Sequence, residues 1–198
     1  MVMDERDQQA FRDGPQILRA FVVAECVERV AQIFTGTRGG DPSRADDVAT
    51  VVEALDALWD FSAEPQVFGP LVERVGRFEE LVITETPDYV AETLEEGSVM
   101  FTLVAFKEAL TYRYEGESHT GLSSIAYGDL IAYFLDKRFP AEGIYAQEGE
   151  ARQRSMQAQD FSTESMERAR VAAGHVSHQR LQFVLASVAA GSSWGSHL

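Results

Sequence analysis

The sequence predicts an all-α protein, a single-domain bundle of about six or seven helices. Apolar residues recur at spacings of three and four along most of the chain, which is the period of an amphipathic helix. No run of β-branched residues alternates with polar ones across a hairpin turn, and residues 81–84 are the one short strand candidate. With 198 residues, 45% of them hydrophobic, the chain can bury one core.

Three segments are expected along the chain. Residues 14–190 are predicted to form the helical domain. Residues 1–13, which are polar, are expected to be a flexible N-terminal segment, and residues 191–198, rich in Gly and Ser, a flexible tail.

The strongest helix prediction covers residues 15–34. Asp13-Gly14-Pro15 favours a start there, and the glycines at 36, 39 and 40 favour an end. Polar side chains, including Glu28 and Arg29, fall mostly between the positions of the apolar stripe.

Two further helices are predicted next. Asp41-Pro42-Ser43 opens the second helix, whose apolar stripe continues to about Phe61. A shorter third helix is expected after Glu64-Pro65, reaching Leu81.

A long apolar series that starts near Thr86 and ends at Gly116 predicts either one helix or two. Gly97 lies within the series, and glycine costs about 1 kcal/mol relative to alanine inside a helix, so both alternatives stay open. Over residues 98–114 apolar side chains occur nearly all round, which predicts a central helix that is covered on several sides.

The C-terminal part is expected to hold two main helices. Residues 122–139 form the first, which Pro140 ends. A looser polar segment follows over residues 141–162, and its part 150–159 could form a solvated helix. The final helix is predicted to begin at Ser162, whose side chain favours a helix N-terminus.

Catalytic motifs are sparse, and no catalytic residue, metal ligand or cofactor is predicted. Cys26 is the only cysteine, which excludes an internal disulfide and favours a buried position. Gly121-Leu122-Ser123-Ser124 lacks the second glycine of a hydrolase nucleophile elbow, so Ser123 or Ser124 is expected to cap a helix. His175 and His178 share a helix face, but no matching acidic residue completes a ligand set, and both are expected to face solvent.

Charge is the strongest compositional feature. Asp and Glu number 32 against 17 Lys and Arg, for a net charge of −15. Such a field repels nucleic acid and an anionic membrane and attracts a basic protein, although acidity can also serve solubility alone. The polar start and the lack of a long uninterrupted apolar stretch predict a cytoplasmic location.

The acidic residues gather in two stretches. Phe78 and Tyr89 are candidates for exposed aromatic side chains near these carboxylates. Exposed aromatic side chains that are surrounded by carboxylates suit the docking of a basic protein, although a charge run is often only a solvated face. The first stretch has no Lys or Arg and supplies the predicted partner-binding residues Glu79, Glu80, Glu85, Asp88, Tyr89, Glu92, Glu95 and Glu96. The second, diluted only by Arg44, contains Asp41, Asp46, Asp47, Glu53, Asp56 and Asp60.

Three segments carry a family resemblance. Phe21-Val22-Val23-Ala24-Glu25-Cys26-Val27-Glu28-Arg29, Gly40-Asp41 and Leu55-Asp56-Ala57-Leu58-Trp59 resemble the YjaG-like family of uncharacterised bacterial helical proteins, over roughly the first two-thirds of the chain. The resemblance implies an all-helical fold with no established activity or catalytic residues. By analogy, relatives in bacterial toxin neighbourhoods are often suspected immunity proteins, which agrees with the acidic field.

The sequence therefore predicts a non-catalytic, acidic protein-interaction module, and an immunity protein that neutralises a basic toxin is its specific form. The expected partner is a basic protein, with neither nucleic acid nor a membrane bound. One alternative is a helical enzyme or sensor with a carboxylate-lined metal or small-molecule pocket. Another is a homo-oligomeric structural protein, for which a homodimer is the simplest case.

Overall fold

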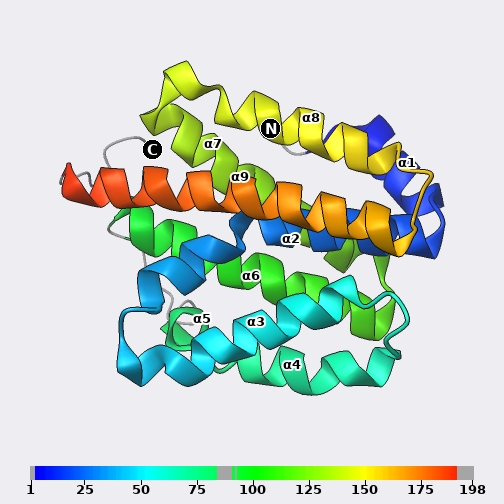
Figure 1. Ribbon diagram of the computed structural model, residues 1–198, viewed down its shortest axis with the longest axis horizontal. Helices are drawn as coiled ribbons and strands as arrows, with labels where there is room; N and C mark the ends of the chain where they lie inside the picture. The colour runs from blue at the N-terminus through cyan, green and yellow to red at the C-terminus, as the bar shows by residue number, and fades with distance from the viewer. Residues whose placement is uncertain (1–2, 84–90, 92, 191–198) are drawn as a thin grey trace.

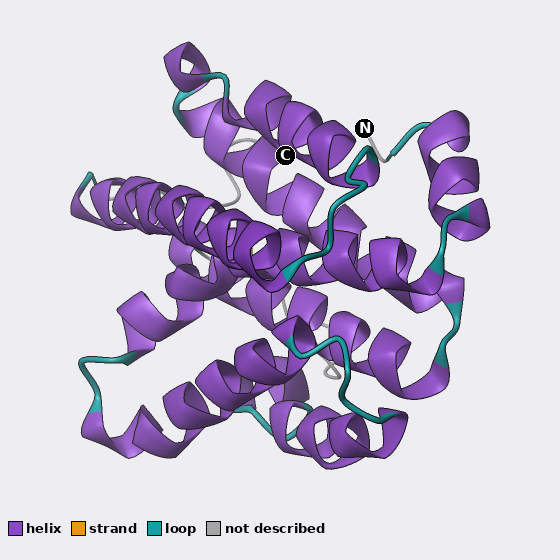
Figure 2. Ribbon diagram, turned by 45° about the vertical axis from the view of Figure 1, so that its right-hand side comes forward, coloured by secondary structure: helices purple, strands orange, loops and turns teal. Residues whose placement is uncertain are grey.

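The computed structural model describes residues 3–83, 91 and 93–190. Within these ranges the chain forms nine α-helices and three short 3-10 helices and has no strand (Figure 1, Figure 2). The all-α class is confirmed, and the described part holds more helices than the six or seven predicted. The α-helices are Glu5–Asp13 (α1), Gln16–Arg38 (α2), Ala45–Trp59 (α3), Phe68–Val75 (α4), Glu79–Ile83 (α5), Leu94–Glu115 (α6), Ser118–Arg138 (α7), Ile144–Met156 (α8) and Thr163–Ala189 (α9), and the 3-10 helices are Pro42–Arg44 (η1), Pro65–Val67 (η2) and Pro140–Glu142 (η3).

Helices α2 and α6 form the centre of the bundle. They pack against each other, while α9 lies along α2 and α7 lies along α6. Helices α3 and α4 cover one side of this pair, and α8 packs on α7 at the other side (Figure 1). The prediction of a central helix over residues 98–114 is confirmed, because α6 contacts α2, α3, α4, α5, α7 and α9.

Helix α2 is buried on more sides than its amphipathic pattern suggests. Glu28 and Arg29, which fall between the apolar positions of the sequence, are both buried. Helices α3, α8 and α9 each pack on α2 and bring polar partners to these two side chains. A pattern within one helix does not reveal partners that come from other helices.

Thr93 and Glu96 determine where α6 begins. The Thr93 hydroxyl accepts a hydrogen bond from the backbone N–H of Glu96, whose carboxylate accepts one from the backbone N–H of Thr93. Gly97 therefore lies within the first turn of α6 and does not divide the helix in two. The helix ends at Gly116, which has a φ of 79° that favours glycine and donates its N–H to the carbonyl of Tyr112.

Within the segment 1–13, for which the sequence predicts flexibility, residues 5–13 form helix α1. Phe11 of α1 is buried, and its ring lies 6.1 Å from that of Tyr112. The single buried side chain of Phe11 thus holds the largely polar helix α1 against the bundle. The local composition of the sequence does not predict this contact. Residues 1–2 and the predicted tail 191–198 lie outside the described residues.

Helix α7 begins at Ser118, earlier than the predicted start at residue 122. Ser123 and Ser124 consequently lie inside α7, so the prediction that one of them caps its start is wrong, and Ser124 is buried and donates to the carbonyl of Ala105 on α6 at 2.9 Å. This bond joins the two helices across their packed faces.

The remaining differences concern short helices. The predicted third helix is divided into η2, α4 and α5, and α8 occupies residues 144–156 where only 150–159 was a candidate. The strand candidate is wrong for residues 81–83, which belong to α5, and Thr84 lies outside the described residues. No helix in the described ranges combines the length and the apolar character needed to span a bilayer.

Candidate functional site

The first acidic stretch lies where α5 and the start of α6 approach the end of α2 and η1. Glu79 and Glu80 belong to α5, and Glu95 and Glu96 belong to the first turn of α6. We call these four residues, together with Asp47 of α3, the acidic corner. The other predicted partner-binding residues, Glu85, Asp88, Tyr89 and Glu92, lie outside the described residues.

Arg44 is the centre of the acidic corner. Its guanidinium donates to both carboxylate oxygens of Glu80, at 2.9 and 2.7 Å, to Asp47 at 2.6 Å, and to Glu79. The side chain is buried, with the guanidinium 5.7 Å from the centre of the Phe34 ring. Because its stem is fixed by packing, Arg44 holds three carboxylates in defined positions.

A second arginine, Arg38 at the end of α2, extends this network to α6. Its Nε lies 3.0 Å from Glu80 Oε1, and its Nη1 lies 3.0 Å from Glu95 Oε1. Burial raises the pKa of Glu80, but the hydrogen bonds from Arg44 and Arg38 outweigh burial and leave that pKa below its usual value. The carboxylate is therefore ionised at neutral pH.

Sequence reasoning missed these two arginines as parts of the site. The stretch from Glu79 to Glu96 contains no basic residue, so it reads as uncompensated acid. The compensation comes from Arg38 and Arg44, which flank the Gly39-Gly40 pair far earlier in the chain. Their position beside a glycine turn was the available signal, but it does not reveal which acids they meet.

The aromatic residues of the site differ from the prediction. Phe78 is buried and stacks on Phe34, with ring centres 5.6 Å apart, so its prediction as an exposed anchor is wrong. Tyr89 lies outside the described residues. Val82 of α5 is the apolar side chain near the corner that is exposed.

The second acidic stretch does not form one patch, because its members have separate partners. Glu53 pairs with Arg74 at 2.7 Å, and Asp56 pairs with Arg170. Two others bind their own turns: Asp41 accepts from Ser43, Asp60 accepts from Ser62, and these bonds lower the pKa of both carboxylates. Of this stretch, Asp47 joins the acidic corner.

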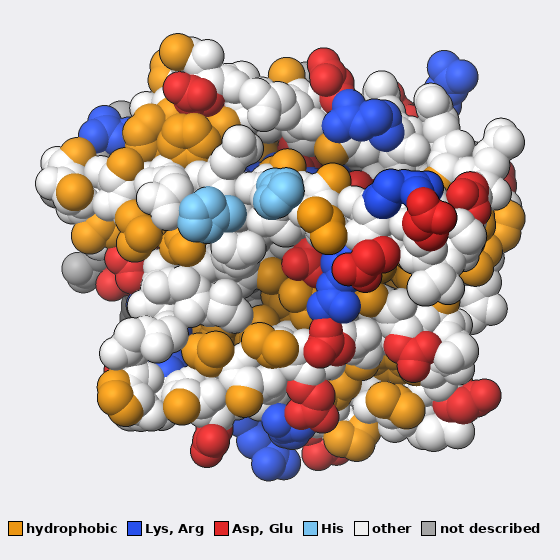
Figure 3. Space-filling model, in the orientation of Figure 1, with side chains coloured by type: hydrophobic (Ala, Val, Ile, Leu, Met, Phe, Trp, Pro, Cys, Tyr) orange, Lys and Arg blue, Asp and Glu red, His pale blue; other side chains and the backbone are white. Residues whose placement is uncertain are grey.

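The histidine and cysteine side chains, which are the candidates for metal or nucleophilic chemistry, lie outside the acidic corner. His175 and His178 are exposed on α9, as predicted, and His178 Nδ1 lies 3.2 Å from Gln32 Oε1. Figure 3 shows histidine side chains on the α9 face, where acidic and basic side chains are interspersed. Within the described ranges no three His, Cys, Asp or Glu side chains converge as metal ligands. Cys26 is buried as predicted, and burial raises the pKa of its thiol to about 12, which keeps it neutral.

A buried charged network between α2, α8 and α9 was not predicted. Arg29 donates to both oxygens of the Glu148 carboxylate, and Arg180 donates to the same carboxylate. Glu25 lies 3.2 Å from Arg29 Nη1 and accepts a hydrogen bond from the hydroxyl of Ser155. The network joins three helices through residues that are distant in sequence.

Asp129 of α7 and Arg152 of α8 form a further buried pair beside this network. Burial raises the pKa of Asp129 to about 6, against the lowering effect of Arg152. The second oxygen of Asp129 and the Nε of Arg152 have no hydrogen-bond partner among the described residues.

Comparison of the chain with protein-family models, curated proteins and solved structures gives no match. The resemblance to the YjaG-like family stays a prediction.

Proposed function

We propose that the protein is a non-catalytic interaction module that binds a basic protein through the acidic corner, as an immunity protein would bind a basic toxin. The observation that carries this proposal is an excess of fixed negative charge. Among the described residues, the four carboxylates of Asp47, Glu79, Glu80 and Glu95 contact two guanidinium groups, those of Arg38 and Arg44. The corner therefore presents net negative charge to solvent.

The acidic corner is organised before any partner arrives. Arg44 is buried and holds its carboxylates through short hydrogen bonds, so little side-chain entropy is lost when a partner docks. The Glu79 side chain is 68% exposed, which leaves its carboxylate accessible to a cationic group of a partner. Exposed Val82 supplies an apolar contact next to it.

The charge of the whole chain supports the same role. A net charge of −15 attracts a basic protein over distances beyond direct contact and raises the association rate. Because such attraction is screened over about 10 Å at 0.1 M salt, binding should weaken as the salt concentration rises.

The test begins with capture of partners at low salt by the immobilised protein, together with co-expression of any basic toxin encoded by a neighbouring gene. The captured protein is purified, and its association rate is measured against the parent chain and Glu79→Lys. We expect the variant to slow association about tenfold at low salt and to have little effect at high salt.

The matched control is Glu73→Lys on α4, which changes the charge equally at a side chain that is 73% exposed and outside the acidic corner. It should slow association about twofold or less, through the net charge alone. Equal effects of the two variants would remove the corner from the proposal, and recovery of no basic protein at low salt would contradict the function itself.

A further inference from the structure

Helix α1 lies at the edge of the bundle, where it packs mainly on α7 (Figure 1). Of its nine residues, all of which the structure describes, Phe11 is the only one that is buried. Helices α2, α6 and α7 instead bury side chains along most of their length. Because the burial of apolar side chains is the main source of stability, α1 is held to the bundle more weakly than these three helices are held to one another.

The Phe11 side chain lies in a socket that α6 and α7 form. Its ring lies 6.1 Å from the Tyr112 ring of α6, at an angle of 52°. Gly121 of α7 forms the floor, because a Cβ atom there would lie 2.9 Å from Phe11 Cζ, closer than van der Waals contact allows. We call Tyr112 and Gly121 the Phe11 socket. The socket is filled by one ring and depends on the absence of a side chain at residue 121.

The polar contacts of α1 stay within its own segment. Gln9 donates to the carboxylate of Asp13 at 2.9 Å. Arg12 donates to the side chain of Gln8 at 3.1 Å, and Gln8 donates to the carbonyl of Met3, a buried residue just before the helix, at 2.8 Å. Among the described residues, no hydrogen bond or ion pair joins α1 to another helix. This segment can therefore leave the bundle without breaking such a bond.

The link between α1 and α2 permits this movement. Gly14, with φ −66° and ψ 153°, and Pro15, with φ −56° and ψ 149°, are both extended, so the hydrogen bonds of α1 do not continue into α2. Pro15 also has no N–H that could bond back to α1. A change in the backbone angles of Gly14 would move α1 while α2 keeps its first hydrogen bond, from the N–H of Arg19 to the carbonyl of Pro15.

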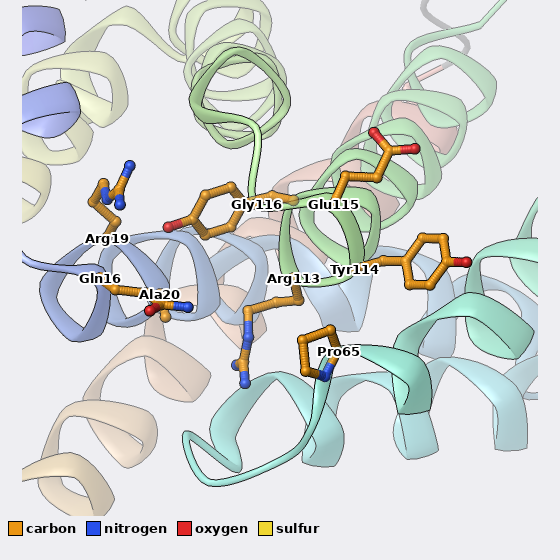
Figure 4. Close-up of a pocket in the computed structure, with 9 residues that line it drawn as sticks. Gln16, Arg19, Ala20, Pro65, Arg113, Tyr114, Glu115 and Gly116 are labelled. Atoms are coloured by element: carbon orange, nitrogen blue, oxygen red, sulfur yellow. The ribbon is translucent and has the colours of Figure 1, made fainter.

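The Phe11 socket adjoins a cavity of about 290 Å³, which Tyr112 also lines, between the first turns of α2 and the end of α6. Figure 4 shows the side chains of Arg19 and Arg113 extending to opposite sides of this cavity, so the two cations do not define a site for one anion. Tyr112 belongs both to the cavity wall and to the socket. Departure of Phe11 would therefore expose the Tyr112 ring beside the cavity.

We propose that α1 is a strap that opens from the bundle as a unit while α2 to α9 stay folded, and that its opening uncovers the Phe11 socket. Opening removes one aromatic side chain from its socket and breaks no hydrogen bond between described helices. The strap is separate from the acidic corner, because the corner includes the first turn of α6 and Tyr112 lies in its last turn. The 22 residues of this helix correspond to about 33 Å.

The first test is hydrogen–deuterium exchange of the folded full chain, followed residue by residue. A helix of nine residues is not stable alone in water, so undocking exposes its amides. We expect the hydrogen-bonded amides of α1 to have similar protection factors and to exchange at least about a hundredfold faster than buried amides of α2 and α6. Protection of α1 equal to that of α2 would overturn the proposal. A steady decline of protection along α1 towards its N-terminus would show fraying of the helix end and would also overturn it.

The second test is Phe11→Ala, which empties the socket. Exchange of the α1 amides should become at least about tenfold faster, while exchange of buried α2 and α6 amides changes less than twofold. The effect stays local because the open state keeps the rest of the bundle folded. Equal acceleration in α1, α2 and α6 would show that α1 unfolds only together with the whole bundle, and the strap would be wrong.

The third test leaves the sequence of α1 unchanged. Gly121→Ala places a methyl group where the Phe11 ring lies and should accelerate exchange of the α1 amides at least about fivefold. The matched control is Gly149→Ala on α8, where a Cβ atom meets no other atom within 4 Å, and it should change this exchange less than twofold. Circular dichroism and the melting temperature establish that each variant is folded. Equal effects of the two alanines on α1 would show that the socket at residue 121 does not hold the strap.

Discussion

Arg29 and Glu148 form a bidentate ion pair in the interior, with nitrogen–oxygen distances of 2.8 to 3.1 Å. Both side chains are at most 2% exposed. Arg180 donates to the same carboxylate, so one acid from α8 compensates a cation from α2 and a cation from α9. Since isolated buried charges are very unfavourable, each member of this group depends on the others.

Glu148→Gln should strongly destabilise the protein. The substitution keeps the size of the side chain but leaves Arg29 and Arg180 buried with less compensating charge. We expect the free energy of unfolding to fall by about 3 to 5 kcal/mol, as measured by urea denaturation at pH 7.

Glu150→Gln is the control for this measurement. Glu150 lies on the same helix, with its side chain 72% exposed, and should change the free energy of unfolding by about 0.5 kcal/mol or less. A loss at Glu148 that is no larger than the loss at Glu150 would show that the buried network does not stabilise the fold.

Asp129 should make the protein less stable as the pH rises, which is the opposite of the effect of a carboxylate with a lowered pKa. Burial raises the pKa of Asp129 from its usual 3.8 to about 6, with Arg152 and Arg29 opposing the rise and Glu148 adding to it. Between these two pKa values the folded chain binds more protons than the unfolded chain, so this group's contribution to stability falls as the pH rises from about 4 to 6. The rise in the pKa of Asp129 from 3.8 to about 6 corresponds to about 3 kcal/mol in the free energy of unfolding.

The comparison that isolates this effect is Asp129→Asn, unfolded in urea at several pH values between 4 and 7. Parent stability should fall relative to the variant across that range, and the difference should become constant above the pKa of about 6. The lowered pKa of Glu148 affects stability at lower pH, because the stabilisation that its carboxylate provides is lost as the pH falls below the usual pKa of 4.5. Parallel pH profiles of parent and variant would contradict a raised pKa at Asp129.

The fold class and the central helix could be predicted from the sequence because burial along a helix leaves a local pattern. The predicted cap at Ser162 is local in the same sense, whereas the cap at Thr93 was not predicted, because the apolar series starts near Thr86. The added helix α1 was not predictable in that way, because its one buried anchor, Phe11, gives no periodic signal.

The site was less predictable because charges are compensated through the fold and not along the chain. Glu80 meets Arg44, 36 positions away, and Arg29 meets Glu148, 119 positions away. A stretch without basic residues can therefore still be partly neutralised.

Thr93→Ala tests the start of α6. The substitution removes the hydroxyl that accepts the N–H of Glu96, and the loss should be about 1 kcal/mol in the free energy of unfolding. Thr111→Ala is the control, because Thr111 lies inside the same helix, where alanine favours the helical state and should be neutral or slightly stabilising. Equal effects of the two substitutions would contradict the capping role of Thr93.

Gly128→Ala tests how closely α7 approaches α2. A Cβ atom at residue 128 would lie 2.6 Å from the Cys26 sulfur, closer than van der Waals contact allows. Alanine favours a helix by about 1 kcal/mol, but the clash should outweigh this gain and destabilise the protein by about 1 to 3 kcal/mol in urea denaturation. In Cys26→Ala the sulfur is absent, so adding Gly128→Ala to that variant should destabilise the protein less than adding it to the parent. A double-mutant cycle compares the two changes in the free energy of unfolding. If Gly128→Ala alone stabilises the protein, the helices are not packed as closely at this point as the contact between residues 26 and 128 requires.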